Sequence, residues 1–600
     1  MSVMRQVVAA LTLLAASLPV PPAQAAVSVT VSPAYTQLVA PATLQFSVQV
    51  TGGGNSDVIW EVDNAVGGSK AYGTITPSGL YTAPQKLPSP ALVTVTAVAK
   101  ADPSASATAT VTLLAQPPQG STYYVAPDGS DGSSGSIEAP WATIQHAADS
   151  VSAGDTVLVR EGTYNEHVHL HVAGNASAGY ITFQSYPGET AVLDGTGLNI
   201  PHGQWGLFTF DNASYVIVSG FEVRNYQTKS RNRVPIGIYV TGAGKNVQIV
   251  SNRIHDIATY AHTTPRQCGS NAFGLTVYGT QAPTAIENIA IAGNEIYNLH
   301  TGCSETLSLD GNVKRFAVLN NSIHDDDNIG IGAIGFERVS KDPKYDQARD
   351  GVIRGNTVYN ITSYGNPDYG KQYAADGIYV DGGTNIVIEQ NLIHHVDLGI
   401  ELASEHEGHT SSFIAARNNI VYEGQSAGIS IGGYAARRGG TDHCIIVNNT
   451  LYANDTEKTG SGEFQIQFNA ANNVFENNIL YAGPQNLFVN DFTDSTNNPA
   501  MLDYNLYFSP EGADAGMWVW QKQRYHGFDV YRQSTGQDEH SLFADPQFVS
   551  LDDPLDLDVV SSSPARGTGA MLGKAMTGKY DFAGYSRTNH GEINIGAYQR

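Results

Sequence analysis

Two carboxyl side chains, Asp381 and Glu401, end similar short segments of the chain. The segments are residues 377–381 (GIYVD) and 399–401 (GIE), in which apolar residues alternate with others as in a strand that buries one face. If these strands are neighbours in a parallel sheet, the two residues are diagonal neighbours with Cα atoms about 8 Å apart. Paired carboxyl groups can hydrolyse glycosidic bonds: one protonates the leaving oxygen, while the other attacks the anomeric carbon or activates water. The spacing therefore predicts a catalytic pair.

More acidic residues surround this pair in the sequence. Stacked acidic groups repel one another, so a face that carries several is costly unless a proton, a cation or a substrate uses it. Carboxylate oxygens are also the ligands that Ca²⁺ prefers. We assign to substrate binding Glu305 and Asp310, and to a metal site Asp326, Asp327, Asp376 and Glu405. The alternative is a solvated acidic face, and turn formation by Asp side chains also explains the run 325–327.

Four other polar side chains lie close to the pair in sequence. Tyr379, His406, Arg437 and Arg438 can hold sugar hydroxyls or the carboxylate of a uronate, and we predict them as substrate-binding residues. An exposed Tyr or Arg on a repeated face can equally serve as structural cover. The inserted segments 337–345, 366–373 and 434–442 are expected to wall the site.

A repeated unit must position these residues. From about residue 237, a strand of the Gly-Ile-Tyr-Val type is followed by an Asn-x-Ile strand, and the Asn recurs about every 27 to 42 residues. The recurring positions are Asn252, Asn294, Asn321, Asn356, Asn391, Asn419, Asn449 and Asn478. The strands are short and no helix is long enough for a crossover, which favours a right-handed parallel β-helix. We assign these asparagines to the scaffold, because Asn accepts left-handed backbone geometry and forms side-chain ladders at repeated turns.

Alternation along the repeated strands sorts their residues into two faces. The inward set is Ile238, Val240, Leu275, Val277, Leu307, Leu309, Ile378, Val380, Ile400, Leu402, Ile429 and Ile431. One outward column runs through Tyr239, Thr276, Ser308, Gly332, Tyr379, Glu401, Ser430 and Gln467. The other runs through Thr241, Tyr278, Asp310, Ile334, Asp381, Ala403, Gly432 and Asn469.

The rest of the chain divides into segments with distinct patterns. Residues 1–25 have the charged, apolar and small-residue regions of a secretory signal peptide. Residues 27–114 alternate in short runs broken by turn residues, as in a small β-sandwich, and 115–121 form a linker. Residues 122–600 form the β-helix, and the apolar spacing of 140–148 predicts a helix that caps its open end. Cys268 and Cys303 lie just before successive repeat strands, and we leave open whether they pair.

Composition excludes several classes of partner. Lys and Arg total 32 against 56 Asp and Glu, a net charge of −24, which repels the phosphates of nucleic acids. No apolar run after the signal approaches the roughly 18 residues that span a membrane. We therefore expect a monomeric protein that is secreted or periplasmic.

Several segments resemble known families. Residues 27–114, with Trp60 expected in the core, resemble the bacterial immunoglobulin-like modules of secreted enzymes. The repeats resemble the β-helices of pectate lyases and related carbohydrate-active families over most of 122–600. Segments 377–381 and 399–401 resemble a β-helical glycoside hydrolase family typified by β-xylosidases, and this resemblance rests on these two segments. It implies a nucleophile at Asp381, an acid/base at Glu401, and a secreted hydrolase that needs no cofactor.

Two other classes of function stay open. A Ca²⁺-dependent polysaccharide lyase needs a cation or an Arg beside the uronate and a base near its C5 proton, and Tyr379 or His406 can be that base. No Lys falls in the outward columns, which favours the hydrolase over the lyase. A non-catalytic glycan-binding protein or adhesin has the same fold, since a fold does not fix a function. Epimerisation of a polyuronate is a further, smaller alternative on the same residues.

Overall fold

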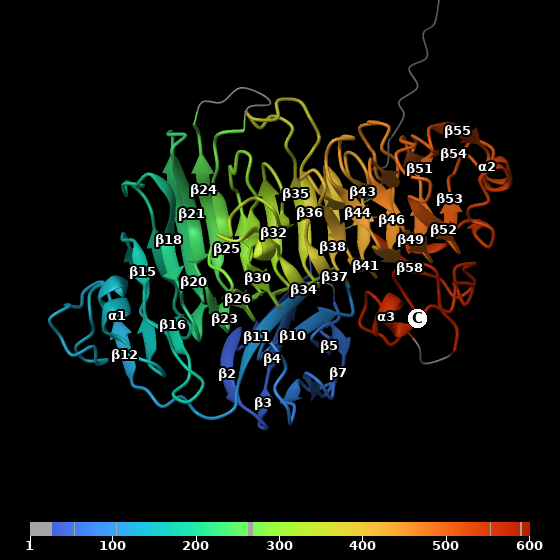
Figure 1. Cartoon of the computed structure of the whole chain (residues 1–600). Coiled ribbons are helices and arrows are strands. Elements are labelled where there is room, and N and C mark those ends of the chain that lie inside the picture. The colour runs from blue at the N-terminus through green and yellow to red at the C-terminus, as the bar shows by residue number, and fades with distance from the viewer. Residues whose placement is uncertain are drawn as a thin grey trace, which may run out of the picture.

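The computed structural model describes residues 27–52, 54–103, 105–261, 268–552, 554–587 and 591–599. From residue 122 onward the chain winds into a long parallel β-helix of three sheets (Figure 1). The predicted signal peptide, residues 1–25, lies outside the described residues. No helix among the described residues is long and apolar enough to cross a membrane.

One of the three sheets carries the residues that the sequence singled out, and we call it the site sheet. It has 13 strands, and neighbouring strands come from successive coils except for the last two, which form an antiparallel hairpin. In sheet order the strands are β15 (Val168–Leu170), β18 (Gly203–Asp211), β21 (Arg233–Thr241), β25 (Phe273–Gly279), β29 (Leu307–Gly311), β33 (Ile331–Ile334), β36 (Asp376–Asp381), β39 (Leu398–Ala403), β43 (Ile429–Gly432), β47 (Phe464–Ile466), β51 (Leu487–Asp491), β54 (Met517–Trp520) and β55 (Gln523–His526).

The other two sheets complete each coil. The outer sheet has 13 strands, from β14 (Gly162–Tyr164) to β56 (Leu542–Phe543). The docking sheet has 19 strands, from β12 (Thr122–Val125) to β52 (Ala500–Asp503), and the N-terminal domain packs on it. Three short helices are α1 (Ile144–Ser150), α2 (Phe528–Thr535) and α3 (Lys574–Thr577). Helix α1 begins at Thr143, whose side chain accepts the His146 N–H, and its apolar face joins the core at the first coil.

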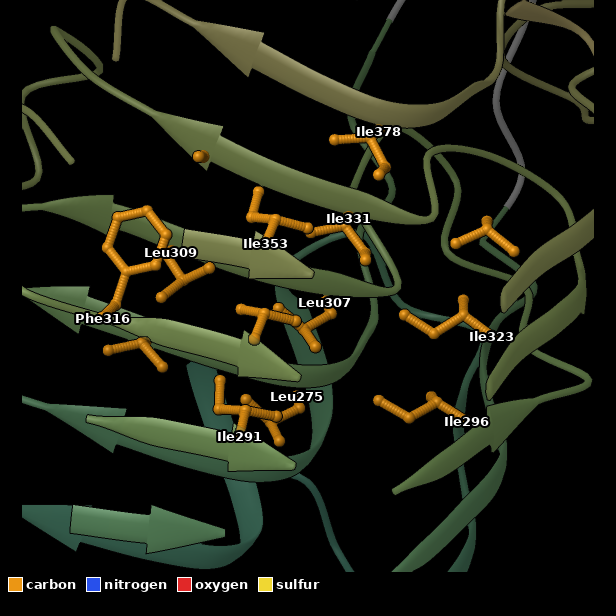
Figure 2. Packing of buried hydrophobic residues seen from close by; sticks show 14 of the residues in the cluster. Leu275, Ile291, Ile296, Leu307, Leu309, Phe316, Ile323, Ile331, Ile353 and Ile378 are labelled. Carbon is orange, nitrogen blue, oxygen red and sulfur yellow. The ribbon is translucent and has the colours of Figure 1, made fainter. Parts of the chain in front are cut away.

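The interior of the solenoid is one apolar core. All of the side chains predicted to point inward from the site sheet belong to it, and each is at most 2% exposed. Figure 2 shows Leu275, Leu307, Ile331 and Ile378 of successive coils stacked beside Ile291 of the docking sheet. The predicted alternation of inward and outward residues is therefore confirmed.

The strand register confirms the first outward column as far as β43. It confirms the second column except at one step, because Ile334 bridges Gly382 and is not paired with Asp381. Tyr379 lies opposite Glu401, and Asp381 lies opposite Ala403, so the catalytic pair predicted from the sequence is diagonal. The last members of the two columns were wrong: Ser430 pairs with Gln465 instead of Gln467, and β47 ends before Asn469. The register is set two residues earlier because Phe464 and Ile466 point into the core.

Stacked asparagines join one corner of successive coils from Asn252 to Asn505. Each side-chain Oδ1 accepts the backbone N–H and the Nδ2–H of the asparagine one coil earlier, as Asn391 does from Asn356 at 3.0 Å in both bonds. The predicted ladder is confirmed and extends to Asn505. The left-handed backbone expected at these asparagines was wrong: it occurs one residue earlier, for example at Gln390 (φ 57°). That residue makes the turn, which leaves the following asparagine extended and pointing inward.

The N-terminal strands form a domain that docks on the β-helix. Its largest sheet has the order β2 (Tyr35–Val39), β11 (Ser106–Leu114), β10 (Leu92–Ala99), β5 (Val58–Val62) and β6 (Ala65–Val66), and Trp60 is buried in its core. In Figure 1 this domain lies beneath the middle of the solenoid. Leu92 shares an apolar cluster with Ile217, Val250 and Leu319 of the docking sheet. The immunoglobulin-like assignment of residues 27–114 stays a prediction.

A charged network also joins the two parts. Arg354 of the docking sheet binds Asp63 of the N-terminal domain at 2.5 Å and lies 3.5 Å from Glu389, and all three are buried or nearly so. Cys268 and Cys303 form a disulfide before β25 and β29, which answers the pairing question that the sequence left open.

Candidate active site

Acidic side chains gather around β36 and β39 of the site sheet and the loops that follow the strands. We call this cluster the acidic site; it comprises Glu305, Asp310, Glu337, Asp376, Asp381, Glu401 and Glu405, together with His406. The site sheet provides the core of the cluster because outward residues of successive coils stack in columns.

Asp381 occupies the centre of the site and is only 3% exposed. Its Oδ1 accepts the backbone N–H of Glu405 at 2.8 Å, and its Oδ2 lies 3.6 Å from His406 Nε2. Burial raises the pKa of Asp381, while the contact with His406 and the bond from Glu405 act in the opposite direction. The carboxylate of Asp381 is therefore buried but has compensating partners in its ionised form.

His406 lies between two carboxylates. Its Nε2 is 3.2 Å from Glu337 Oε1, on the loop after β33, and 3.6 Å from Asp381 Oδ2. These two neighbours raise the pKa of His406 to about 10, so the imidazole is positively charged at neutral pH. His406 in turn lowers the pKa of Glu337.

Glu401 has a different environment from Asp381. Its Oε1 accepts a hydrogen bond from Ser430 Oγ at 3.3 Å and another from Gln467 Nε2, and no cationic side chain among the described residues forms an ion pair with it. Burial, followed by the negative charge of Glu405, raises the pKa of Glu401 to about 7, although both hydrogen bonds oppose the rise. The two diagonal carboxyls thus differ, since Glu401 retains a proton near neutrality and Asp381 faces a cation.

Asp376 and Tyr379 lie on β36, the strand that carries Asp381. Both are buried, and Asp376 Oδ1 has no hydrogen-bond partner among the residues that the structure describes. Burial and then the negative charge of Glu401 raise the pKa of Asp376 well above its ordinary value. Tyr379 donates its hydroxyl to Glu405 Oε1 at 3.4 Å, and burial followed by Asp381 raises its pKa well above 10.

Glu305 and Asp310 extend the site toward the earlier coils. Burial raises the pKa of Glu305 to about 7, and burial followed by Glu305 raises that of Asp310 well above its ordinary value. Asp310 is 3% exposed, and its Oδ1 has no hydrogen-bond partner. Both residues lie in the acidic site, where the sequence predicted substrate contacts.

The residues predicted as metal ligands do not assemble into one cluster. Asp326, at the end of β32 (Ser322–Asp326) in the outer sheet, accepts the Leu299 N–H at 2.8 Å and the Thr306 hydroxyl at 2.9 Å. Asp327 accepts the Thr301 N–H at 2.7 Å. These hydrogen bonds agree with the alternative stated for residues 325–327, in which the Asp side chains form turns. Among the described residues, the metal-ligand group that forms in the acidic site is Glu337, Asp381 and His406, whose ligand atoms lie within 4.8 Å of one another; Asp376 and Glu405 are not part of it.

The two arginines differ in their contacts. Arg438 donates to the backbone carbonyl of Glu405 at 3.0 Å, and its guanidinium lies 4.8 Å from the ring centroid of Tyr434. Its positive charge lowers the pKa of Glu405 against the larger effect of burial. Arg437 is exposed. Arg438 therefore borders the acidic site.

The sequence placed Gln467 in the outward column of Glu401 but did not identify it as a partner, and it placed Glu337 in a loop expected to wall the site but not in the site itself. Glu337 belongs to an inserted loop, so no column position marks it. Gln467 follows the end of β47, and only the true register shows that its side chain reaches back across Ser430 to Glu401.

Sequence comparisons place the chain among known proteins. It is 39% identical over 451 residues to the uncharacterized protein YwoF of Bacillus subtilis (strain 168), an alignment that covers 74% of this chain and 92% of YwoF. The chain belongs to the YwoF family. The chain also matches two family models: "Pel9A-like, right handed beta helix region" over residues 123–273, and "Right handed beta helix region" over residues 237–451.

Two pectate lyases are among the similar proteins. Pectate lyase PEL9 of Emericella nidulans is 28% identical over 178 residues, which cover 25% of this chain and 42% of that enzyme. The crystal structure of pectate lyase Pel9A has a TM-score of 0.43 and 14% identity, covering 80% of this chain and 96% of Pel9A. The lacto-N-biosidase of Eubacterium ramulus has a TM-score of 0.43 and 12% identity, covering 65% of this chain and 64% of that chain. The Pel9A-like match ends at residue 273, before every residue of the acidic site.

Proposed function

We propose that this protein hydrolyses glycosidic bonds of a polysaccharide in the acidic site. The observation that supports this most is the contrast between its diagonal carboxyls. Glu401 has a pKa of about 7, whereas Asp381 is hydrogen-bonded by a backbone N–H and faces the charged His406. Two carboxyl groups whose surroundings favour different protonation states are suited to act as an acid and an anion in one reaction.

In the proposed reaction, Glu401 donates its proton to the glycosidic oxygen as the bond from that oxygen to the anomeric carbon breaks. Asp381, as the carboxylate, stabilises the positive charge on the sugar and either attacks the anomeric carbon or removes a proton from the attacking water. One water molecule is consumed, and its hydroxyl ends on the new reducing end. If Asp381 is the nucleophile, Glu401 takes the proton of this water and is restored. If Asp381 is the base, Asp381 takes that proton, and proton exchange with solvent restores both carboxyl groups. No metal is needed for these steps.

Access to Asp381 requires movement in its surroundings. The residue is 3% exposed, whereas the side chain of Glu337 is 49% exposed and that of His406 is 24% exposed. We therefore propose that the loop of Glu337 and the turn of His406 move aside to admit the sugar. Glu305, Asp310 and Arg438 border the same space and are proposed substrate contacts.

A lyase is the second candidate, and the similarity to pectate lyase PEL9 favours it. Elimination needs a base that is unprotonated near neutral pH. His406, with a pKa of about 10, and Tyr379, with a pKa raised well above 10, both carry their protons there. Because these were the two bases that the sequence suggested, the protonation of the site favours hydrolysis. Binding of Ca²⁺ by Glu337 and Asp381 would support the lyase instead, because carboxylate oxygens are its usual ligands.

Digestion of neutral and uronate-containing polysaccharides tests the proposal. The protein is incubated with each polymer with and without EDTA, and new reducing ends and absorbance at about 235 nm, the signature of an unsaturated uronate formed by β-elimination, are followed. Hydrolysis predicts reducing ends without absorbance, unaffected by EDTA. Absorbance that EDTA abolishes would establish the calcium-dependent lyase instead, and silence on every polymer would favour a glycan-binding protein.

The catalytic pair is tested with Asp381→Asn and Glu401→Gln. Each is expected to lower kcat at least about 1,000-fold, since each removes a group that moves a proton or charge in the transition state. Glu407→Gln is the matched control, because Glu407 is an exposed carboxylate close by in the same turn. Equal activity of all three variants would contradict the assignment.

We also propose that the protein is exported and acts as a monomer outside the cytoplasm. The signal-like residues 1–25 and the disulfide support export, because disulfides persist in oxidising compartments. The immunoglobulin-like nature of residues 27–114 belongs to the same proposal.

A further inference from the structure

A second group of polar side chains lies on the site sheet, at its first strands. Residues 167–171 read HVHLH, and Val168 and Leu170 of β15 are fully buried. The alternation of a strand therefore turns His167, His169 and His171 to the outward face, the same face that bears the acidic site.

The next coil brings a carboxylate to this row of imidazoles. Leu170 of β15 pairs with Phe210 of β18, so the following residues, His171 and Asp211, stand opposite each other. The rings of His169 and His171 have centroids 3.9 Å apart. Ligand atoms of His169, His171 and Asp211 all lie within 4.8 Å of one another.

The imidazole of His169 has an unused nitrogen. Its Nε2 is buried and has no hydrogen-bond partner in the described part of the chain, which is costly for a polar atom without a ligand. His167 differs from His169, because its Nε2 lies 2.9 Å from the hydroxyl of Tyr226 and so has a partner.

Neighbouring groups hold the ligands in place. The backbone N–H of His169 donates to Gln145 Oε1 at 2.6 Å, and Gln145 Nε2 donates to the His169 carbonyl at 3.2 Å, which fixes β15 to helix α1. Asn212 Nδ2 donates to Asp211 Oδ1 at 2.8 Å and orients that carboxylate. Hydrogen bonds of this kind to ligand groups are typical of metal sites.

We propose that His169, His171 and Asp211 bind one divalent transition metal ion, for which Zn²⁺ is the probe. Two imidazole nitrogens and one carboxylate are a frequent ligand set for zinc, at bond lengths of about 2.0 to 2.2 Å, and leave a fourth position open. Small side-chain rotations close the ligand atoms to the roughly 3.4 Å spacing of a tetrahedral site with such bonds. The open position accepts water or a saccharide oxygen.

The metal site is distinct from the acidic site. Asp211 lies on β18 and Asp381 on β36, which are five strands apart in the site sheet, or about 24 Å at 4.8 Å per strand. Both lie on one outward face, so a polymer that follows the sheet can contact them together. The proposal depends on the ligand geometry alone and does not rest on the proposed hydrolysis.

Zinc binding to the full chain, measured by calorimetric titration, tests the proposal. Compared with the wild type, His171→Ala and Asp211→Asn are expected to weaken binding at this site by at least about 10-fold, since each removes a ligand. His202→Ala is the matched control, because it removes an exposed histidine in the loop before β18. His406→Ala removes a ligand of the other metal-ligand group, Glu337, Asp381 and His406, and so shows whether zinc binds there instead.

The outcomes are distinguishable. A site lost in His171→Ala and Asp211→Asn but kept in His202→Ala and His406→Ala supports the proposal. No zinc binding by the wild type, or a single site lost only in His406→Ala, overturns it. Thermal unfolding shows whether each variant is folded. Zn²⁺ is expected to raise the Tm of the wild type and of His202→Ala, but not that of His171→Ala.

Discussion

At the scale of single residues, the chemistry depends on how burial and neighbours divide protons among the acidic groups. Asp381, Glu401 and Asp376 lie on two neighbouring strands but have different surroundings. Asp381 faces the cation His406, and Glu401 accepts hydrogen bonds from two neutral donors. One oxygen of Asp376 has no hydrogen bond from any described residue. Desolvation favours the neutral form of each, and the specific partners then separate their pKa values. The sequence identified the diagonal pair, but these partners depend on side chains from inserted loops and from the next strand.

Gln467 is predicted to set the alkaline limit of activity. Its amide donates to Glu401 and favours the ionised carboxylate, so Gln467→Leu raises the pKa of Glu401. Because Glu401 must be protonated to act as the acid, the alkaline limb of the kcat/KM profile, expected near pH 7, moves upward by roughly 0.5 to 1 pH unit, the value of one hydrogen bond. The pH–rate profile is the measurement.

Gln465→Leu is the control for this shift, because Gln465 contacts Ser430 rather than Glu401. An alkaline limb that stays in place in Gln467→Leu, or moves equally in both variants, would contradict the role of Glu401 as the acid.

Glu401 is also predicted to make stability depend on pH. Its folded-state pKa of about 7 lies above the ordinary 4.5, so between these values the folded chain holds a proton that the unfolded chain has released. The contribution of this group to the free energy of unfolding therefore falls as pH rises through that window. Glu401→Gln cannot titrate, so its stability relative to the wild type is higher at pH 8 than at pH 4.

Urea denaturation of both proteins at the two pH values measures this difference, and Glu407→Gln serves as the exposed control. A relative stability of Glu401→Gln that does not change with pH would show that Glu401 is not the buried, proton-retaining group described here.

At the scale of elements, the repeat could be predicted well and the loops could not. Alternation identified the inward residues of the site sheet, and the recurring asparagines identified the ladder, because both follow from a periodic backbone. The register failed at β47, where Phe464 and Ile466 shift the pattern by two residues. Glu337, His406 and the row His167, His169 and His171 lie in loops or in the irregular first coils, where no repeat marks a partner.

The asparagine ladder predicts a large effect of one buried substitution. Asn391→Ala removes the acceptor of the Asn356 backbone N–H and the donor to the Ile353 carbonyl, both bonds of 3.0 Å in a fully buried corner. Leaving these groups unpaired is expected to cost about 2 to 4 kcal/mol of the free energy of unfolding, by urea denaturation. Asn497→Ala, at an exposed position, is expected to change it by less than about 0.5 kcal/mol. Equal effects of the two would contradict a stabilising ladder.

At the scale of the whole molecule, the N-terminal domain is fastened to the solenoid by an apolar strip and a buried ion pair. Sequence patterns predicted the strands of this domain and the linker, but not the docking, because surfaces that meet across separate domains leave no periodic signal. The contacts join residues as far apart as Asp63 and Arg354. Docking covers apolar residues of the docking sheet that would otherwise face water.

Arg354→Met is predicted to loosen this docking. The change leaves Asp63 without its cation at a site where the carboxylate is 2% exposed, and breaking such a pair costs about 3 to 5 kcal/mol. Limited proteolysis is expected to cut the linker at residues 115–121 faster than in the wild type. Arg231→Met, which changes an exposed arginine, is the control. Equal protection of both variants would show that the apolar strip alone holds the domain.

The masses of the products decide whether the acidic site hydrolyses glycosidic bonds. Oligosaccharides released from a responsive polymer are weighed by mass spectrometry, because hydrolysis adds one water for each bond cleaved and elimination adds none. Products that contain this water are expected from the wild type, and none from Asp381→Asn or Glu401→Gln. Unsaturated products that lack the water, or hydrated products from both variants at the wild-type rate, would contradict it.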